Sequence, residues 1–149
     1  MSNENKELIE QLDGVRPVVK FKDNDHLNIY LKYWQEKLQL TDWLITVSLT
    51  EGKCYSGNEE CAGKNIYQVE NRLSAIVISN YWDEDFMVKQ YQELTLVHEL
   101  LHLIVPMETH KKETLENILY ERTMHGIIER TAKALIMTKY NMTLQDFLA

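Results

Sequence analysis

Two histidines and a glutamate in the segment TLVHELLHLIV have the spacing of a metal site. His98 and His102 are four residues apart, so on a helix their side chains lie on one face, one turn apart. Neutral imidazole is a good zinc ligand, and two imidazoles in this arrangement can bind one tetrahedral ion. Glu99 is rotated by about 100° around the helix from His98, which places it outside the coordination shell. We therefore expect Zn2+ at His98 and His102, with Glu99 as a general base that acts on a metal-activated water.

The residues around this motif argue against a chance match. The three polar side chains are embedded in an apolar helical run formed by Leu94, Leu96, Val97, Leu100, Leu101, Leu103 and Ile104. Burying two imidazoles and a carboxylate without partners would cost several kcal/mol, and one metal ion would satisfy all three. The alternative is a buried polar patch that matches the motif by accident, and the apolar context favours the metal.

A catalytic zinc usually has three protein ligands and an open position, so a third ligand must come from the next helix, expected over about Glu113–Tyr140. The apolar arc predicted for this helix consists of Tyr120, Met124, Ile127, Ile128, Ala134 and Leu135. Glu121 falls just inside the edge of this arc, where an unpaired carboxylate would be costly. Glu129 falls on the opposite, solvated side and is discounted. We therefore expect Glu121 as the third metal ligand.

His125 lies at the margin of the same arc, one turn beyond Glu121, and is the alternative third ligand. If Glu121 binds the metal, His125 or Tyr120 could instead donate a hydrogen bond to the oxyanion of a tetrahedral intermediate, which makes His125 a candidate catalytic residue. The bland interpretation of His125 is a half-exposed surface histidine. His26 and His110 are expected to be plain surface residues.

The pattern along the chain predicts helices around a small sheet, that is, an α+β domain. A short helix is expected at Lys6–Leu12, and Asp23-Asn24-Asp25 should cap a helix of about His26–Leu38. Alternation in WLITVSLT predicts a strand, Glu51–Lys64 is expected to be loop, and Asn65–Val69 and Leu73–Asn80 should form a hairpin that turns at Glu70-Asn71. Asp83-Glu84-Asp85 should open the motif helix, which runs to Ile104 and is stopped by Pro106. Beyond the long helix, Thr143–Asp146 resembles a capping box.

Length and charge narrow the class of protein. The 149 residues suffice for one domain with a single core, and residues 1–22 are expected to form an N-terminal extension of it. The net charge of −7 provides no basic face for nucleic acid, and no apolar run is long enough for a membrane span. The polar N-terminus is unlike a signal peptide, so a cytoplasmic location is expected. Cys54 and Cys61 are expected to be unremarkable thiols.

These residues give the chain a resemblance to the zincin metallopeptidases. HELLH at His98–His102, followed 19 positions later by Glu121, resembles the gluzincin arrangement of thermolysin-like enzymes. The order WQEKLQLTDWLITV, SAIVISNYW, LTLVHELLHLIV is similar to small zincin-like proteins of bacteriophages and prophages, which are labelled metallopeptidases. No G-x-x-H follows the motif, so the chain is unlike a metzincin. Related phage-type sequences often carry a Glu where this chain has His125, which leaves the third ligand open.

The resemblance implies a minimal zincin-like fold, with a small mixed or antiparallel sheet packed on the motif helix and on the long helix that follows. It also implies that His98 and His102 are ligands, that Glu99 is the catalytic base, and that the strand around Leu73–Asn80 lines the cleft, where its edge could pair with an extended peptide. The function expected is zinc-dependent hydrolysis of a peptide or protein substrate. A hypothesis of a different class is a zinc-stabilised domain of phage origin that binds a partner protein without turnover; a fourth protein ligand in place of an open position would favour it.

Overall fold

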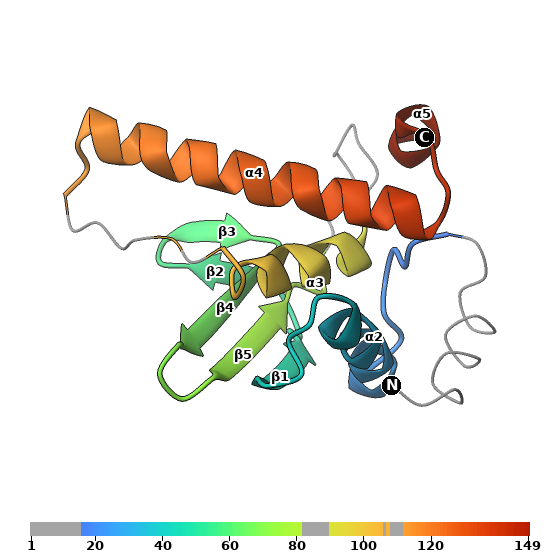
Figure 1. Cartoon of the computed structure of the whole chain (residues 1–149). Helices are drawn as coiled ribbons and strands as arrows, with labels where there is room; N and C mark the ends of the chain where they lie inside the picture. Colours follow the sequence, from blue (N-terminus) through green and yellow to red (C-terminus); the bar gives the residue numbers. More distant parts are fainter. Residues whose placement is uncertain (1–15, 82–89, 106, 108–111) are drawn as a thin grey trace.

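The structure is a computed structural model that describes residues 16–81, 90–105, 107 and 112–149. It is a mixed α+β arrangement of helices around a small sheet (Figure 1). The elements, in chain order, are α2 (Asn24–Lys37), β1 (Leu44–Leu49), β2 (Cys54–Ser56), β3 (Glu59–Cys61), β4 (Gly63–Gln68), β5 (Leu73–Ile78), α3 (Gln92–Leu101), α4 (Leu115–Lys139) and α5 (Leu144–Leu148). The short helix expected at Lys6–Leu12 lies outside the described residues.

The main sheet has three strands in the order β1-β5-β4. β5 runs parallel to β1 and antiparallel to β4, so the expected β4–β5 hairpin is confirmed. Because β5 is the central strand, both of its edges are occupied, and the expectation that an extended peptide could pair with the edge of Leu73–Asn80 is wrong. Of these three strands, β4 and β1 are at the edges.

The segment Glu51–Lys64, expected to be loop, contains a second small sheet. β2 and β3 form an antiparallel hairpin in which Cys54 is paired with Cys61 and Ser56 with Glu59. Gly57, in the connection between them, has a positive φ of 63°, a conformation that glycine adopts without strain. The strands have three residues each, too few for an alternating apolar pattern to stand out in the sequence.

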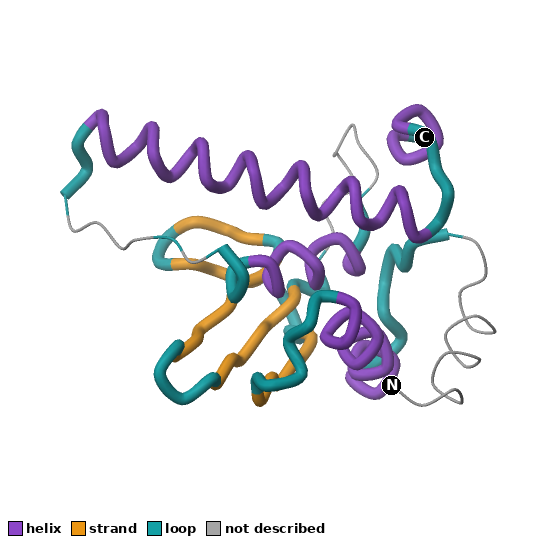
Figure 2. The backbone as a smooth tube through the Cα atoms, viewed as in Figure 1, coloured by secondary structure: helices purple, strands orange, loops and turns teal. Residues whose placement is uncertain are grey.

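One face of the main sheet is covered by α2 and α3, and α4 lies across the outer side of α3 (Figures 1 and 2). The interior residues of α3 have almost no exposed surface: Leu96, Val97, Leu100 and Leu101 are 0–4% exposed. Val18 and Phe21, from the described part of the expected N-terminal extension, also lie in this core. The other face of the sheet keeps Leu44, Ile66 and Leu73 exposed.

The ends of the helices follow their capping residues. The Asp23 side chain accepts a hydrogen bond from the backbone N–H of His26 at the start of α2, and Thr143 and Asp146 form the expected capping box at α5. α3 is shorter than predicted, because Gln90 and Tyr91 precede the helix and His102 is already its C-cap. The expected start at Asp83-Glu84-Asp85 lies outside the described residues.

A buried ion pair ties the end of α4 to the start of α3. Glu93 has no exposed surface, and its carboxylate accepts hydrogen bonds from Lys139 Nζ at 2.7 Å and from the Tyr140 hydroxyl at 2.6 Å. Trp34 Nε1 of α2 donates to the same carboxylate at 3.2 Å. The Lys139 ammonium also lies over four aromatic rings, those of Tyr30, Tyr33, Trp34 and Tyr140. Three helices therefore meet at one compensated charge.

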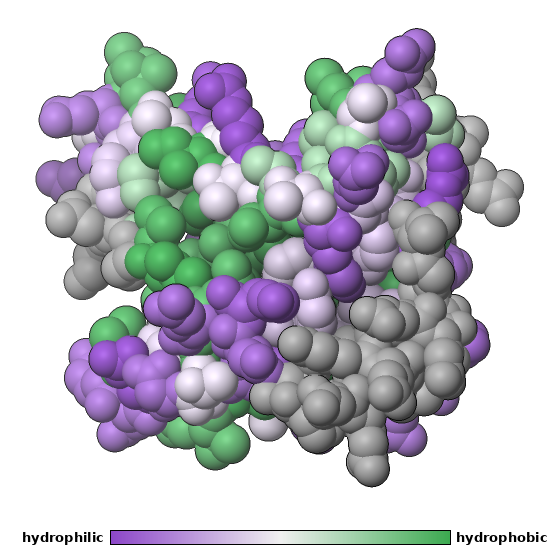
Figure 3. Space-filling model, turned by 45° about the vertical axis from the view of Figure 1, so that its right-hand side comes forward, coloured by the Kyte–Doolittle hydropathy of each residue, from purple (hydrophilic) through white to green (hydrophobic). Residues whose placement is uncertain are grey.

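The surface is mixed in character. On the face shown in Figure 3, apolar residues gather at the centre and towards the left, and hydrophilic residues lie below them and to their right. Within the described parts of the chain, every helix is too short or too polar to cross a lipid bilayer.

Candidate metal centre

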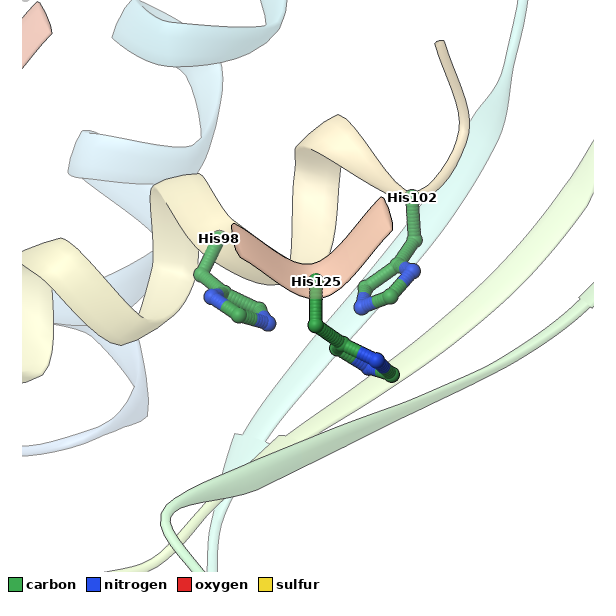
Figure 4. A group of neighbouring side chains, drawn as sticks. All are labelled: His98, His102 and His125. Carbon is green, nitrogen blue, oxygen red and sulfur yellow. The ribbon is translucent and has the colours of Figure 1, made fainter. Parts of the chain in front are cut away.

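Three histidine side chains converge from two helices (Figure 4). His98 lies on α3 and His102 at its C-cap, one turn further on, while His125 comes from α4. One ring nitrogen of each imidazole lies within 4.8 Å of the corresponding atoms of the other two. The ring centroids are 5.2 Å apart for His98 and His102 and 5.4 Å apart for His102 and His125. The expected pairing of His98 with His102 on one face is therefore present, and α4 adds a third imidazole.

The orientation of α4 explains why His125 takes this place. The residues that α4 buries are Ile128, Ala132 and Ile136, at the i, i+4, i+8 spacing of one helical face. The arc predicted from the sequence is rotated away from this stripe, since it included Ile127, which is 47% exposed. His125 lies one turn before the true stripe and therefore points towards α3.

Glu121, expected as the third metal ligand, does not belong to this group. It is exposed, and the three ligand atoms that the structure brings together are all histidine nitrogens. Glu121 precedes His125 by one turn on the same side of α4, yet it is not one of the clustered ligands. Tyr120, named as a possible oxyanion donor, is likewise not among the described residues that line the pocket next to the histidines.

Glu129, discounted as a solvated residue, is in contact with the motif. Its Oε2 atom lies 2.7 Å from Nδ1 of His98, and its Oε1 atom lies 3.5 Å from Lys133 Nζ. A carboxylate on one ring nitrogen fixes the orientation of an imidazole and leaves the other nitrogen free for a metal. Glu129 is therefore the residue that sequence analysis missed; its i+4 spacing from His125 and i−3 spacing from Ala132 would place it beside the stripe.

Glu99 lines the same pocket as the three histidines but stands outside their group of ligand atoms. It is 7% exposed and is not one of the clustered ligand atoms, as its 100° rotation on the helix requires. Burial raises the pKa of Glu99 to about 7, against a smaller lowering by His98. A carboxyl group with a pKa near neutrality can both accept and return a proton at physiological pH.

Strand β4 approaches α3 closely at Glu99. The Asn65 side chain donates a hydrogen bond from Nδ2 to the backbone carbonyl of Glu99 at 2.9 Å and accepts one from the Ser74 hydroxyl at 2.7 Å. Gly63 has no side chain in the way; a Cβ atom there would lie 2.7 Å from Cγ2 of Thr95 and 3.5 Å from Cγ of Glu99. The glycine thus permits the edge strand to lie against the motif helix.

The imidazoles differ in their electrostatics. Burial and the neighbouring His98 and His125 lower the pKa of His102 to about 4, so His102 is neutral at pH 7 and free to donate its lone pair. Burial also acts to lower the pKa of His98, but the hydrogen bond with Glu129 and the charges of Glu99 and Glu129 outweigh it and raise the pKa. The reciprocal hydrogen bond with His98 lowers the pKa of Glu129. The two carboxylates, Glu99 and Glu129, therefore favour a positive charge on the His98 ring.

A pocket of about 470 Å³ opens over this group. Its lining brings together residues from the β2–β3 hairpin, β4, α3, α4 and the positions next to them, namely Ser56, Cys61, Ala62, Gly63, Lys64, Asn65, Tyr67, Gln90, Leu94, Thr95, His98, Glu99, His102, His125 and Glu129. β4, an edge strand of the main sheet, contributes four of them. The pocket has room for part of an extended chain next to Glu99 and the three imidazoles.

The donor set fits zinc. Three imidazoles form one of the ligand sets of catalytic zinc sites. Tetrahedral bonds of about 2.0–2.1 Å place ligand nitrogens roughly 3.3–3.4 Å apart, so atoms that already lie within 4.8 Å of one another need only small side-chain movements. Among the described His, Cys, Asp and Glu residues, no fourth joins the group. The arrangement thus has three protein donors and faces an open pocket.

Of the two other histidines, the structure describes only His26, which lies outside this group. His26 was expected at the surface, but it is only 5% exposed; its Nδ1 atom accepts a hydrogen bond from the Lys22 backbone, and its ring packs against Phe21 and Tyr30. Its role is therefore in the core. His110 lies outside the described residues.

Comparisons of the chain with protein-family models, with curated proteins and with solved structures find no match.

Proposed function

We propose that this protein is a zinc-dependent peptide-bond hydrolase with a minimal zincin-like fold. The observation that carries the proposal is the convergence of His98, His102 and His125 at an open pocket, next to the buried carboxylate of Glu99. In this proposal the three histidines hold zinc, so His125 replaces Glu121 as the third ligand. Zinc in such a site supplies Lewis-acid activation of a water molecule and of a carbonyl oxygen.

The chain's own residues supply the proton transfers and the positioning. A carboxylate oxygen of Glu99, which lines the pocket beside the histidines, accepts a proton from the attacking water and delivers it to the leaving amine nitrogen. Glu129 holds the ring of His98 in place through Nδ1. Among the described strands, the main sheet has β5 on one side of β4 and no strand on the other. This outer edge lines the pocket through Gly63–Asn65 and offers backbone groups to an extended peptide.

The alternative function, a zinc-stabilised binding domain without turnover, accounts for less of the site. Structural zinc sites are closed by a fourth protein ligand, and the described residues offer three. A binding domain also has no use for a carboxylate that is buried at an energetic cost beside the metal ligands.

The test compares zinc content and peptidase activity in four forms of the full chain. Zinc is measured by elemental analysis after dialysis, and activity by cleavage of a mixed library of internally quenched peptides. Glu99→Gln is expected to retain its zinc and to lose activity by about 10²- to 10⁴-fold, the range of general acid–base catalysis. Activity that survives this substitution would exclude Glu99 as the base.

The third ligand is tested by His125→Ala, with Glu121→Ala as the matched control on the same helix. Four-ligand zinc peptides bind with about 10–16 kcal/mol, so one ligand contributes roughly a quarter of this and its loss weakens binding by about 70- to 800-fold. The Glu121 variant should bind zinc like the parent protein. The opposite ranking of the two variants would restore Glu121 as the ligand.

A further inference from the structure

The β2–β3 hairpin holds two cysteines face to face. Cys54 and Cys61 are directly opposite each other in the antiparallel pairing, and their Sγ atoms are 3.1 Å apart. Cys54 is 3% exposed, whereas Cys61 is half-buried. Both are free thiols, and neither belongs to the histidine group.

The geometry of this pair suits a disulfide. Directly opposed residues of an antiparallel pair have Cα atoms about 4.5–5.5 Å apart, within the roughly 4.4–6.8 Å that disulfides span. The sulfurs must approach by about 1 Å to reach the bonding distance of about 2.05 Å. Side-chain rotation can supply that movement, so the hairpin need not change its register.

We propose that Cys54 and Cys61 form a reversible disulfide that clamps the β2–β3 hairpin. The oxidant is a small-molecule disulfide of the glutathione class. The half-exposed Cys61 attacks it as the thiolate, which forms a mixed disulfide and releases one thiol. Cys54, as the thiolate, then attacks the Cys61 sulfur and releases the second thiol. The two protein thiols lose two protons and two electrons, and the S–S bond of the oxidant is reduced to two thiols.

The surroundings of Cys61 disfavour its thiolate form. Burial, the hydrogen bond with Cys54, the charge of Cys54 and that of Glu99 raise the pKa of Cys61 to about 12, against a lowering by Lys64. Since the thiolate is the attacking species, the raised pKa slows the attack, and the reaction must be followed until the disulfide-to-dithiol ratio no longer changes. The stability of the disulfide, not its rate of formation, is therefore the quantity to measure.

The clamp lies in the wall of the pocket. Cys61, Ala62 and Gly63 line the same pocket as His98 and Glu99, and Lys64 Nζ donates a hydrogen bond to the Tyr55 carbonyl of the hairpin at 3.3 Å. Oxidation would hold the β2–β3 hairpin, and with it this wall of the pocket, in one position, and reduction would allow the hairpin to move. This regulatory consequence rests on the proposed function, whereas the disulfide itself does not.

The test uses the full chain freed of metal with EDTA and equilibrated in glutathione redox buffers. After an acid quench, the disulfide is detected by a mass loss of about 2 Da and by protection of both thiols from alkylation. The expected product is a monomer that has lost both thiols together. At the same glutathione ratio, the disulfide-to-dithiol ratio should be at least about tenfold higher in the folded chain than in urea, because the hairpin raises the effective concentration of one thiol at the other.

Three results would overturn the disulfide: equal ratios in the folded and urea-unfolded chains, a persistent glutathione adduct on Cys61, or disulfide-linked dimers. Cys54→Ser is the matched variant; it should keep a glutathione adduct on Cys61 that the parent chain resolves. Because the parent chain carries the main comparison, poor folding of this variant would not weaken the test.

The regulatory consequence is tested by peptide cleavage with the zinc-loaded oxidised and reduced forms. A change in KM of at least about threefold between the forms is expected, because the clamp acts on the wall of the binding pocket. Equal KM values would remove the regulatory role and leave the disulfide. Absence of cleavage in both forms would defeat the proposed function and again leave the disulfide.

Discussion

The buried carboxyl group of Glu99 should make the metal-free protein less stable as the pH rises, and Glu99→Gln should abolish this effect. The side chain is 7% exposed, and burial raises its pKa from 4.5 to about 7. Glutamine has nearly the same shape and cannot ionise. The difference in unfolding free energy between variant and parent therefore isolates the cost of placing charge at this position.

The sign and size follow from the two pKa values. Below pH 4.5 the group is protonated in the folded and unfolded states, so ionisation contributes nothing. Between pH 4.5 and about 7 the unfolded state ionises while the folded state resists it, and the parent loses stability with rising pH. At about 1.36 kcal/mol per pH unit, the loss reaches roughly 3 kcal/mol above pH 7. Glu99→Gln should thus gain about 3 kcal/mol on the parent between pH 4.5 and pH 8.

Urea unfolding of EDTA-treated protein, followed by tryptophan fluorescence at a series of pH values, measures this difference. Glu121→Gln is the matched control, since that carboxylate is exposed and its removal should leave the pH dependence of the parent. A difference between Glu99→Gln and the parent that stays constant from pH 4.5 to pH 8 would refute the argument. It would mean that water or a cation solvates Glu99 in the folded state.

Three further predictions concern the surroundings of the site. Glu129→Ala should weaken zinc binding by about 10- to 100-fold, as the loss of a group that orients a ligand usually does; competition with a chromophoric chelator measures it. Lys139→Met leaves the buried Glu93 carboxylate without its positive partner and should lower the unfolding free energy by about 3–5 kcal/mol in urea titrations. Gly63→Ala puts a methyl group 2.7 Å from a side-chain atom of α3 and should cost about 1–3 kcal/mol. The control Gly126→Ala, where nothing lies within 4 Å, should instead stabilise α4 by up to about 1 kcal/mol.

Local signals predicted the motif well, because its geometry is contained within one helical turn. The four-residue spacing of His98 and His102 places both on one face of any helix, and the apolar run around them matches the buried interior of α3. The capping residues Asp23 and Thr143 each accept a hydrogen bond from a backbone N–H three residues further on, so they too can be predicted from the local sequence. Such features need no knowledge of the rest of the fold.

The third imidazole could not be chosen in the same way, because it depends on how α4 rotates against α3. Apolar residues occur on several sides of α4, and Ile127 remains exposed while its neighbour Ile128 is fully buried. The buried stripe of α4 includes Ala132. Its small side chain lets the two helices approach closely, but alanine is only a weak signal of a buried helix face in the sequence. The position of β4 at the edge of the sheet could not be predicted from the sequence either, because the order of strands depends on pairing between distant segments.

The position of His125 on α4 has a consequence for metal affinity. No residue of α4 before Ile128 is buried, whereas its far end is held by Lys139 and Glu93. His125 therefore lies on the half of α4 that has no buried residues to hold it against the rest of the protein. An ion that joins His125 to α3 would act as a clasp, and its apparent affinity would be the intrinsic affinity multiplied by the fraction of time that the helix is already closed.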